Sequence, residues 1–189
     1  KGHNPYRKMP AYEKALTFEP DIVVIHLGLN DTDPRNWPKF RDDFTKDYIE
    51  LIRSFQEKNP AAKVWICRMT PIFSWHPRFK SSTRMWYDQV QAEIERVAKV
   101  TGVPLIDLNT PLYNRPDLFP DALHPTDEGA GIIAKTIYSS ITGNYGGLQL
   151  PDIFTNNMVM QRNRSVKFWG IADVATEVIV HFAGKTKKT

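Results

Sequence analysis

The chain has 189 residues, of which 41% are hydrophobic and 12% aromatic, so it can bury a core, and this excludes a disordered protein. Its formal net charge of +4 arises partly from basic residues near both ends, without a basic stripe interleaved with aromatic residues, which argues against nucleic-acid binding. No apolar run approaches the ~20 residues that a membrane-spanning helix needs. The single cysteine, Cys67, permits no intrachain disulfide and is interpreted as a small buried hydrophobic residue.

The first part of the chain predicts a short helix, a buried strand and a long helix. The short helix is expected over residues 10–16. Residues 22–25 (IVVI) form an apolar, β-branched run, typical of a strand buried on both faces of a parallel sheet. This run leads into the polar turn Gly28-Leu29-Asn30-Asp31. Apolar residues at helical spacing across 39–58 predict an amphipathic helix that covers the sheet, and Asn59-Pro60 ends it.

Two further strand-then-helix pairs follow. Residues 63–68 predict a second buried strand, and a long loop over 69–82 separates it from a helix that ends at Gly102. Residues 103–108 predict a third strand, and the next helix is expected over 127–141. Three strand-then-helix units in succession predict a parallel, doubly wound α/β sheet.

The sequence changes in character after residue 142. Residues 143–149 contain three glycines and predict a linker. Beyond it, three short runs have strand character, at 158–160, 166–169 and 177–182. About forty residues can hardly bury a core alone. We therefore expect an α/β domain over 1–142, a linker over 143–149, and over 150–189 the start of an all-β segment that packs on the first domain or belongs to a larger one.

Parallel sheets bind ligands at the carboxyl ends of their strands, and two polar motifs are expected at this edge. Asn30 follows the strand at 22–25, where its amide can donate to an oxyanion. Asp121 stands three residues before His124, in a turn that enters the helix for which Thr126 is the expected N-cap. The Asp121 carboxylate can reach Nδ1 of His124, which leaves the other ring nitrogen free to act as a general base. Alone, such a pair is more often a surface salt bridge.

Together these motifs resemble the SGNH/GDSL hydrolase family over roughly residues 10–142. Gly28-Leu29-Asn30-Asp31 matches the family's G-x-N-D block, and Asp121-Ala122-Leu123-His124 matches its D-x-x-H block. The resemblance implies a three-layer, flavodoxin-like α/β fold and acyl transfer without metal or cofactor. It assigns Asn30 to the oxyanion hole, Gly28 to the turn that shapes it, and Asp121 and His124 to the acid and base of a triad.

The family's serine nucleophile and its glycine oxyanion donor have no counterpart before Ile22, where both should lie. We therefore expect that the first strands of the fold are missing, that this sequence is part of a longer protein, and that the fragment alone is inactive. The serines present lack the G-D-S context. Ser74, in the loop after the second strand, is the only one that could approach the site.

The tail carries a second resemblance. Residues 150–170 (LPDIFTNNMVMQRNRSVKFWG) are similar to the opening of sialate O-acetylesterases, in which a β-rich segment precedes an SGNH-type catalytic region. This implies an O-acetylated sugar, above all an O-acetylated sialic acid, as substrate. It also implies a downstream esterase region in the same parent chain, and a periplasmic or secreted location in a bacterium.

Four side chains are candidates for contacts with a sugar substrate. Side chains that could stack on a sugar or bind its carboxylate are Trp37, Trp75, His76 and Arg78, although protein packing is as good an explanation for Trp75. His26 is interpreted as a hydrogen-bonded core histidine, and a zinc site from His26, His76 and His124 lacks ligand spacing. A non-catalytic glycan-binding or scaffolding module is the competing class. A lipid acylhydrolase of the same fold would need an apolar acyl groove.

Overall fold

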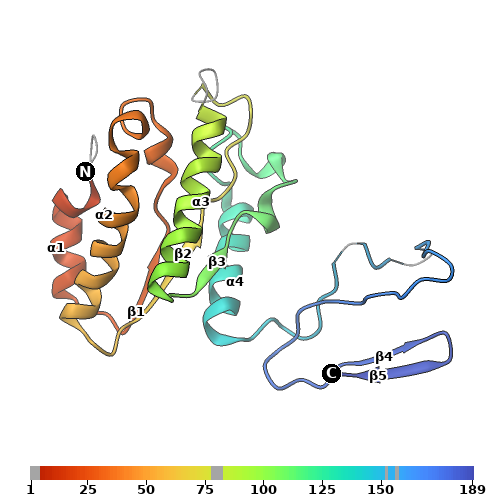
Figure 1. The fold of residues 1–189 in the computed structure, drawn as a ribbon. Coiled ribbons are helices and arrows are strands. Elements are labelled where there is room, and N and C mark those ends of the chain that lie inside the picture. The colour runs from red at the N-terminus through yellow and green to blue at the C-terminus, as the bar shows by residue number, and fades with distance from the viewer. Residues whose placement is uncertain (1–4, 78–82, 152, 156–157) are drawn as a thin grey trace. The chain divides into compact units, whose positions relative to one another are not determined.

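The computed structural model describes residues 5–77, 83–151, 153–155 and 158–189. The chain divides into two compact units, Lys1–Thr136 and Ile137–Thr189, which are described separately. Figure 1 shows the elements of both units. Within the described residues, no helix combines the length and the apolar character needed to cross a bilayer.

The first unit is built on a parallel sheet of three strands in the order β1–β2–β3. The strands are β1 (Ile22–Ile25), β2 (Lys63–Arg68) and β3 (Leu105–Asp107). All run the same way, as the registers Val23↔Val64 and Ile66↔Leu105 show. The predicted parallel α/β sheet is thus confirmed, and the loops after all three strands meet at its carboxyl edge.

The prediction that β1 is buried on both faces is only half right. Val23 and Ile25 are 7% and 5% exposed, whereas Ile22 is 52% exposed and Val24 half-buried. Alternate side chains of a strand point to opposite faces. β1 lies at one edge of the described sheet, and the face of the strand that carries Ile22 is less covered than the face that carries Val23 and Ile25.

Helices fill the connections between the strands, within a few residues of the predicted bounds. α2 packs against α1 and α3, and α3 packs against β2 (Figure 1). α2 begins at Trp37 because Pro38, which lacks an N–H, is tolerated in the first turn. The helices and 3-10 turns are η1 (Tyr6–Lys8), α1 (Pro10–Thr17), η2 (Leu29–Thr32), α2 (Trp37–Lys58), α3 (Thr83–Thr101), η4 (Thr110–Leu112), η5 (Pro116–Leu118) and α4 (Asp127–Thr142).

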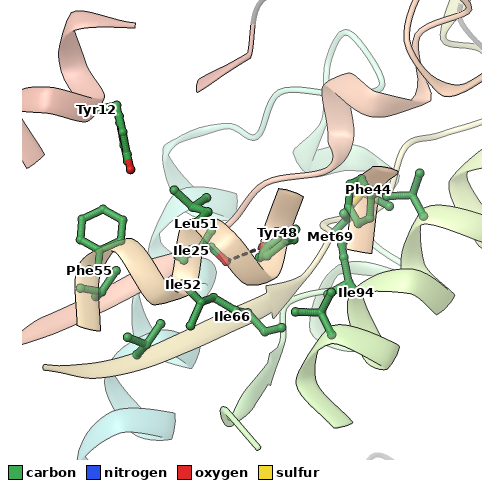
Figure 2. Close-up of a cluster of buried hydrophobic side chains, with 14 of the residues drawn as sticks. Tyr12, Ile25, Phe44, Tyr48, Leu51, Ile52, Phe55, Ile66, Met69 and Ile94 are labelled. Carbon is green, nitrogen blue, oxygen red and sulfur yellow. Dashed lines mark hydrogen bonds between the residues drawn. The ribbon is translucent and has the colours of Figure 1, made fainter. Parts of the chain in front are cut away.

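The core of the first unit lies between the sheet and the apolar stripe of α2. Tyr48, Ile52 and Phe55 of that stripe are at most 5% exposed and belong to one cluster with Ile25 and Ile66. Figure 2 shows this packing, together with the hydrogen bond from the Tyr48 hydroxyl to the Ile25 carbonyl. The aromatic stripe predicted from the sequence therefore covers the sheet.

The second unit contains one antiparallel pair, β4 (Ile179–Phe182) and β5 (Lys185–Lys188). The predicted strand at 177–182 is confirmed in part, but the runs at 158–160 and 166–169 form no strand. Val159, in the first of these runs, is 98% exposed, so its side chain is not buried. The predicted domain boundaries remain predictions.

Candidate active site

Asp121 and His124 form a hydrogen-bonded pair on the turn that leads into α4. Oδ2 of Asp121 lies 2.6 Å from Nδ1 of His124, while Oδ1 accepts the backbone N–H groups of His124 and Leu123 at 2.6 and 3.0 Å. These hydrogen bonds, that of the His124 ring foremost, hold the pKa of Asp121 well below its usual range. An ionised carboxylate can only accept, so in the neutral ring Nδ1 carries the proton and Nε2 keeps its lone pair. The His124 side chain is 75% exposed, which leaves Nε2 accessible to a reacting hydroxyl.

The backbone of Ala122 bends the chain so that the pair can meet. Ala122 has a φ of +67° and is fully buried. Its N–H donates to the Phe119 carbonyl, and its own carbonyl accepts the N–H of Phe73 at 2.9 Å. Thr126 then caps α4 as predicted, since its hydroxyl accepts the N–H of Gly129 at 3.3 Å. Packing thus holds the turn in a backbone conformation that a non-glycine residue rarely adopts.

Gly28 shapes the turn that carries Asn30. Its φ of +124° suits glycine, and an added Cβ would lie 3.0 Å from the Met69 sulfur and 3.1 Å from Val90 and Ile94. The Gly28 carbonyl accepts the N–H of Asp31, which opens η2. One side of the turn is therefore pressed against the core, and on the other side Asn30 is exposed.

Two hydrogen bonds tie the separate loops of the site together. The N–H of Thr70, after β2, donates to Nε2 of His26, after β1, at 3.4 Å. The Phe73–Ala122 bond joins the loop after β2 to the turn of the Asp121–His124 pair. Both motifs therefore lie at the carboxyl edge of the sheet. Burial lowers the pKa of His26, which favours the neutral ring that accepts through Nε2. The predicted hydrogen bond is confirmed, but His26 is half-buried rather than a core residue.

A cavity of about 440 Å³ lies beside the Gly28 turn. Its polar lining includes Arg7, Asn30, Asp31 and Asp47, and side chains of α2, among them Phe40, supply much of its apolar lining. Burial raises the pKa of Asp31 to about 6, and the charge of Asp47 acts in the same direction. The lining is mixed in polarity rather than a continuous apolar groove.

The four suggested substrate contacts fall in different environments. Trp37 is only 3% exposed, lies edge-on to Phe44 and donates from Nε1 to Gln89, so burial in the core contradicts a sugar-stacking role for it. Trp75 is 53% exposed, and His76 is half-buried in the same turn. Arg78 lies outside the described residues.

No serine in the described part of the chain hydrogen-bonds to His124, whose ring contacts Asp121. Ser54 lies within α2 and donates to the Leu51 carbonyl, and Ser74 is exposed in the turn after β2. Cys67 is fully buried, which confirms the predicted buried residue, and burial raises the pKa of its thiol to about 12. Across the described ranges, no three His, Cys, Asp or Glu side chains are grouped to hold a metal ion.

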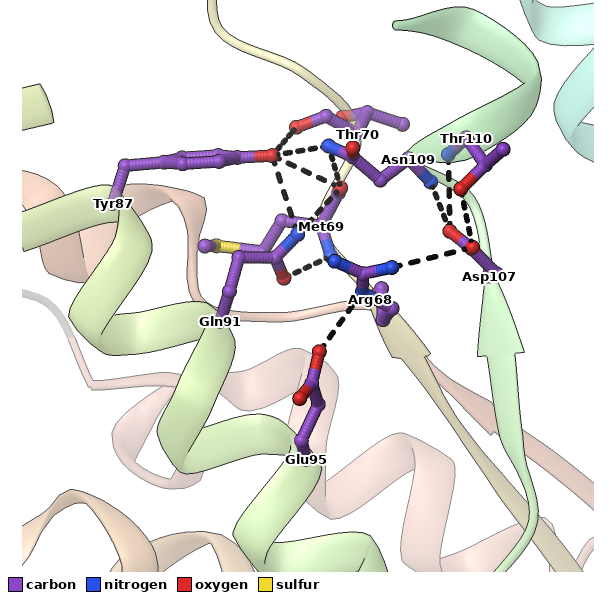
Figure 3. A network of polar contacts seen from close by, with 9 residues as sticks. All are labelled: Arg68, Met69, Thr70, Tyr87, Gln91, Glu95, Asp107, Asn109 and Thr110. Carbon is purple, nitrogen blue, oxygen red and sulfur yellow. Dashed lines mark hydrogen bonds and ion pairs between the residues drawn. The ribbon is translucent and has the colours of Figure 1, made fainter.

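A buried polar network behind the site was not foreseen from the sequence (Figure 3). Gln91 of α3 accepts the N–H of Met69 at 2.8 Å, and the hydroxyl of Tyr87 lies 3.2 Å from the Met69 carbonyl. Asn109, after β3, donates to both Tyr87 and the Met69 carbonyl. The only signal in the sequence was the placement of Tyr87 and Gln91 one turn apart beside the apolar positions of the helix.

Comparisons with known proteins agree with this fold. The family model described as the GDSL-like lipase/acylhydrolase family matches residues 4–132. An acetylxylan esterase of Xylanibacter ruminicola is 31% identical, with 75% of this chain and 32% of that protein covered. The chain thus spans about a third of the length of this curated relative.

Solved structures give the same result. An acetyl xylan esterase superposes with a TM-score of 0.54 at 25% identity, covering 68% of this chain and 71% of the other. A GDSL-like lipase from Bacteroides thetaiotaomicron gives a TM-score of 0.51 at 26% identity, covering 68% and 65%. The family model matches more than half of the chain. The chain therefore belongs to the GDSL-like lipase/acylhydrolase, or SGNH, family.

Proposed function

We propose that this chain is part of a carbohydrate acetylesterase that cleaves acetyl esters by serine acyl transfer. The observation that carries the proposal is the 2.6 Å contact between Asp121 and Nδ1 of His124, which leaves an accessible Nε2. Two similar proteins bear the names acetylxylan esterase and acetyl xylan esterase, which supports an acetylated carbohydrate as substrate.

In this mechanism each residue has one task. Nε2 of His124 removes the proton from the attacking serine hydroxyl and later returns it to the departing sugar oxygen. Asp121 holds the ring in the correct tautomer and stabilises the imidazolium. The exposed Asn30 side chain donates to the oxyanion of the tetrahedral intermediate, on the turn that Gly28 shapes.

The nucleophile itself is proposed to come from sequence outside these 189 residues. In a serine hydrolase the loss of the nucleophilic serine costs about a million-fold in rate. The chain alone should therefore be inactive, and a protein extended upstream to a G-D-S block should be active. Strong, serine-inhibitor-sensitive esterase activity from this chain alone would contradict the missing nucleophile.

The substrate has two specific candidates. Similarity to named acetylxylan esterases favours an acetylated xylan, whereas the tail at 150–170 resembles sialate O-acetylesterases and favours an O-acetylated sialic acid. Acetate release from each, measured with the full-length protein, separates them.

The central test compares the full-length protein with two variants. His124→Ala should abolish release of acetate, and Asn30→Ala should lower kcat by about 100- to 1,000-fold. Asn114→Ala, which changes an exposed asparagine far from the G-x-N-D turn in sequence, is the matched control and should leave kcat unchanged. Equal rates for the wild type and His124→Ala would overturn the proposal.

A non-catalytic glycan-binding module is the second candidate, because no serine among the described residues hydrogen-bonds to His124. Natural absence of a serine block upstream would favour the module. A lipid acylhydrolase is less well supported, since charged groups interrupt the apolar lining of the cavity beside Asn30. Rates on acetyl esters compared with long-chain acyl esters distinguish the lipid acylhydrolase.

A further inference from the structure

Trp75 is an exposed aromatic residue with one face already covered. Its ring stacks on Phe73, with centroids 5.1 Å apart and an angle of 19° between the planes. The residue is nevertheless 53% exposed. One broad face therefore rests on Phe73, and much of the remaining indole surface meets solvent. Trp37 of the same unit, by contrast, is only 3% exposed, as expected for a tryptophan that packs in the core.

The ring beneath Trp75 is itself packed against the core. Phe73 packs against Phe119 at 5.3 Å, and Phe119 is fully buried in a cluster with Leu112 and Leu118. The N–H of His76 donates to the Phe73 carbonyl at 3.0 Å and closes the turn that contains Trp75. An aromatic surface held in this way loses little conformational entropy when a ligand stacks on it.

The same support ties Trp75 to the Asp121–His124 pair. The N–H of Phe73 donates to the carbonyl of Ala122, which lies between the two residues of the pair in sequence. The indole and its supporting ring are therefore joined, through this backbone hydrogen bond, to the turn that carries the candidate general base.

We propose that the solvent-facing surface of Trp75 is a subsite on which a pyranose ring of the glycan stacks while an acetyl group of the same glycan reaches His124. This inference rests on the proposed function and specifies the ligand of that site. The ring faces of a pyranose carry C–H groups, and burying them against an indole removes apolar surface of both partners from water. The subsite takes a neutral sugar ring and needs no charged partner.

Binding to the 189-residue chain tests the subsite without any nucleophile. The probe is an acetylated xylo-oligosaccharide, titrated calorimetrically against the wild type, Trp75→Ala and Trp75→Phe. Trp75→Ala should weaken binding by about tenfold or more, and Trp75→Phe, which keeps a smaller ring, should fall between them. Trp169→Ala is the matched control, because Trp169 is 55% exposed but belongs to the second unit, and it should bind as the wild type does. Unchanged affinity in Trp75→Ala, or equal losses in Trp75→Ala and Trp169→Ala, would overturn the subsite.

A second measurement covers the case in which Trp75→Ala does not fold. The five tryptophans give indole N–H signals in NMR spectra, and the Trp75 signal is the one missing from Trp75→Phe. It should shift when the oligosaccharide is added to the wild type, whereas the Trp37 signal, assigned in the same way from Trp37→Phe, should not. A Trp75 signal that stays in place at saturating oligosaccharide, or no binding at all, contradicts the subsite.

The full-length protein separates this inference from the proposed function. Trp75→Ala should raise KM for the acetylated oligosaccharide about tenfold and leave kcat/KM for 4-nitrophenyl acetate within twofold of the wild type. If the wild type hydrolyses neither ester, the proposed function fails, while the binding data still decide the subsite. If both esters are hydrolysed and Trp75→Ala changes neither rate, the subsite alone fails.

Discussion

The N–H of Phe73 donates to the carbonyl of Ala122 over 2.9 Å, across forty-nine positions of sequence. This bond joins the loop that follows β2 to the turn in which Asp121 meets His124. A second bond, from Thr70 to His26, joins the same loop to the end of β1. The loop after β2 thus links the two motifs, although it contains no residue of either.

Asp121→Asn should lower kcat of the full-length protein by about 10,000-fold while the fold is retained, by analogy with the same change in a Ser-His-Asp protease. An amide can donate to Nδ1, which favours the tautomer whose proton sits on Nε2 and blocks its use as a base. The measurement is kcat on an acetyl ester, with circular dichroism to confirm folding. Asp117→Asn, which alters a carboxylate paired with Arg115 on a neighbouring turn, is the control and should keep its rate. A loss below tenfold in Asp121→Asn would remove Asp121 from the mechanism.

Gly28→Ala should destabilise the chain by about 2 kcal/mol or more, since it combines an unfavourable φ with overpacking. The new Cβ would lie 3.0 to 3.1 Å from Met69, Val90 and Ile94, all of them in the core. Urea denaturation measures the change in the free energy of unfolding. Gly131→Ala in α4 is the control, because a Cβ there meets nothing within 4 Å, and it should be neutral or slightly stabilising. If both variants are equally stable, the Gly28 turn is not held as described.

Gln91→Leu should cost about 1 to 3 kcal/mol, because it leaves the buried N–H of Met69 without its acceptor. The Met69 carbonyl still accepts hydrogen bonds from Tyr87 and Asn109 in this variant. The expected loss of stability therefore comes mainly from the unpaired N–H of Met69. Gln56→Leu, at an exposed position of α2, is the matched control and should change stability little. Chemical denaturation of both variants measures the difference, and equal stability would show that the network of Figure 3 is unimportant for folding.

Local patterns allowed much of the fold to be predicted. β2 has the predicted bounds, and α4 begins at the predicted Asp127, because a continuous apolar run and a capping threonine are signals carried by neighbouring residues. The Asp121–His124 contact was also predictable from its spacing. The positive φ of Ala122 was not, since it depends on the distant Phe73, and neither was the burial of Trp37.

The tail was predicted less well for a related reason. Residues 158–160 and 166–169 have strand propensity but pair with no strand in the described residues. β5 was missed because it contains three lysines and therefore has no apolar pattern. Pairing with β4 therefore overrides the local preference of β5.

Asp31→Asn should remove a pH dependence of stability between about pH 4 and pH 6. Burial raises the pKa of Asp31 from 3.8 to about 6, so between these values the folded protein holds a proton that the unfolded chain releases. The resulting stabilisation is complete below about pH 4 and is lost as the pH rises through about 6. The free energy of unfolding falls by at most about 3 kcal/mol over this range. An asparagine cannot ionise, so the free energy of unfolding of Asp31→Asn relative to the wild type should rise from pH 4 to pH 7.5. Asp42→Asn, with a side chain 95% exposed, is the control and should show no such rise. Parallel stability profiles for Asp31→Asn and the wild type across this range would show that Asp31 ionises as freely in the folded protein as in the unfolded chain.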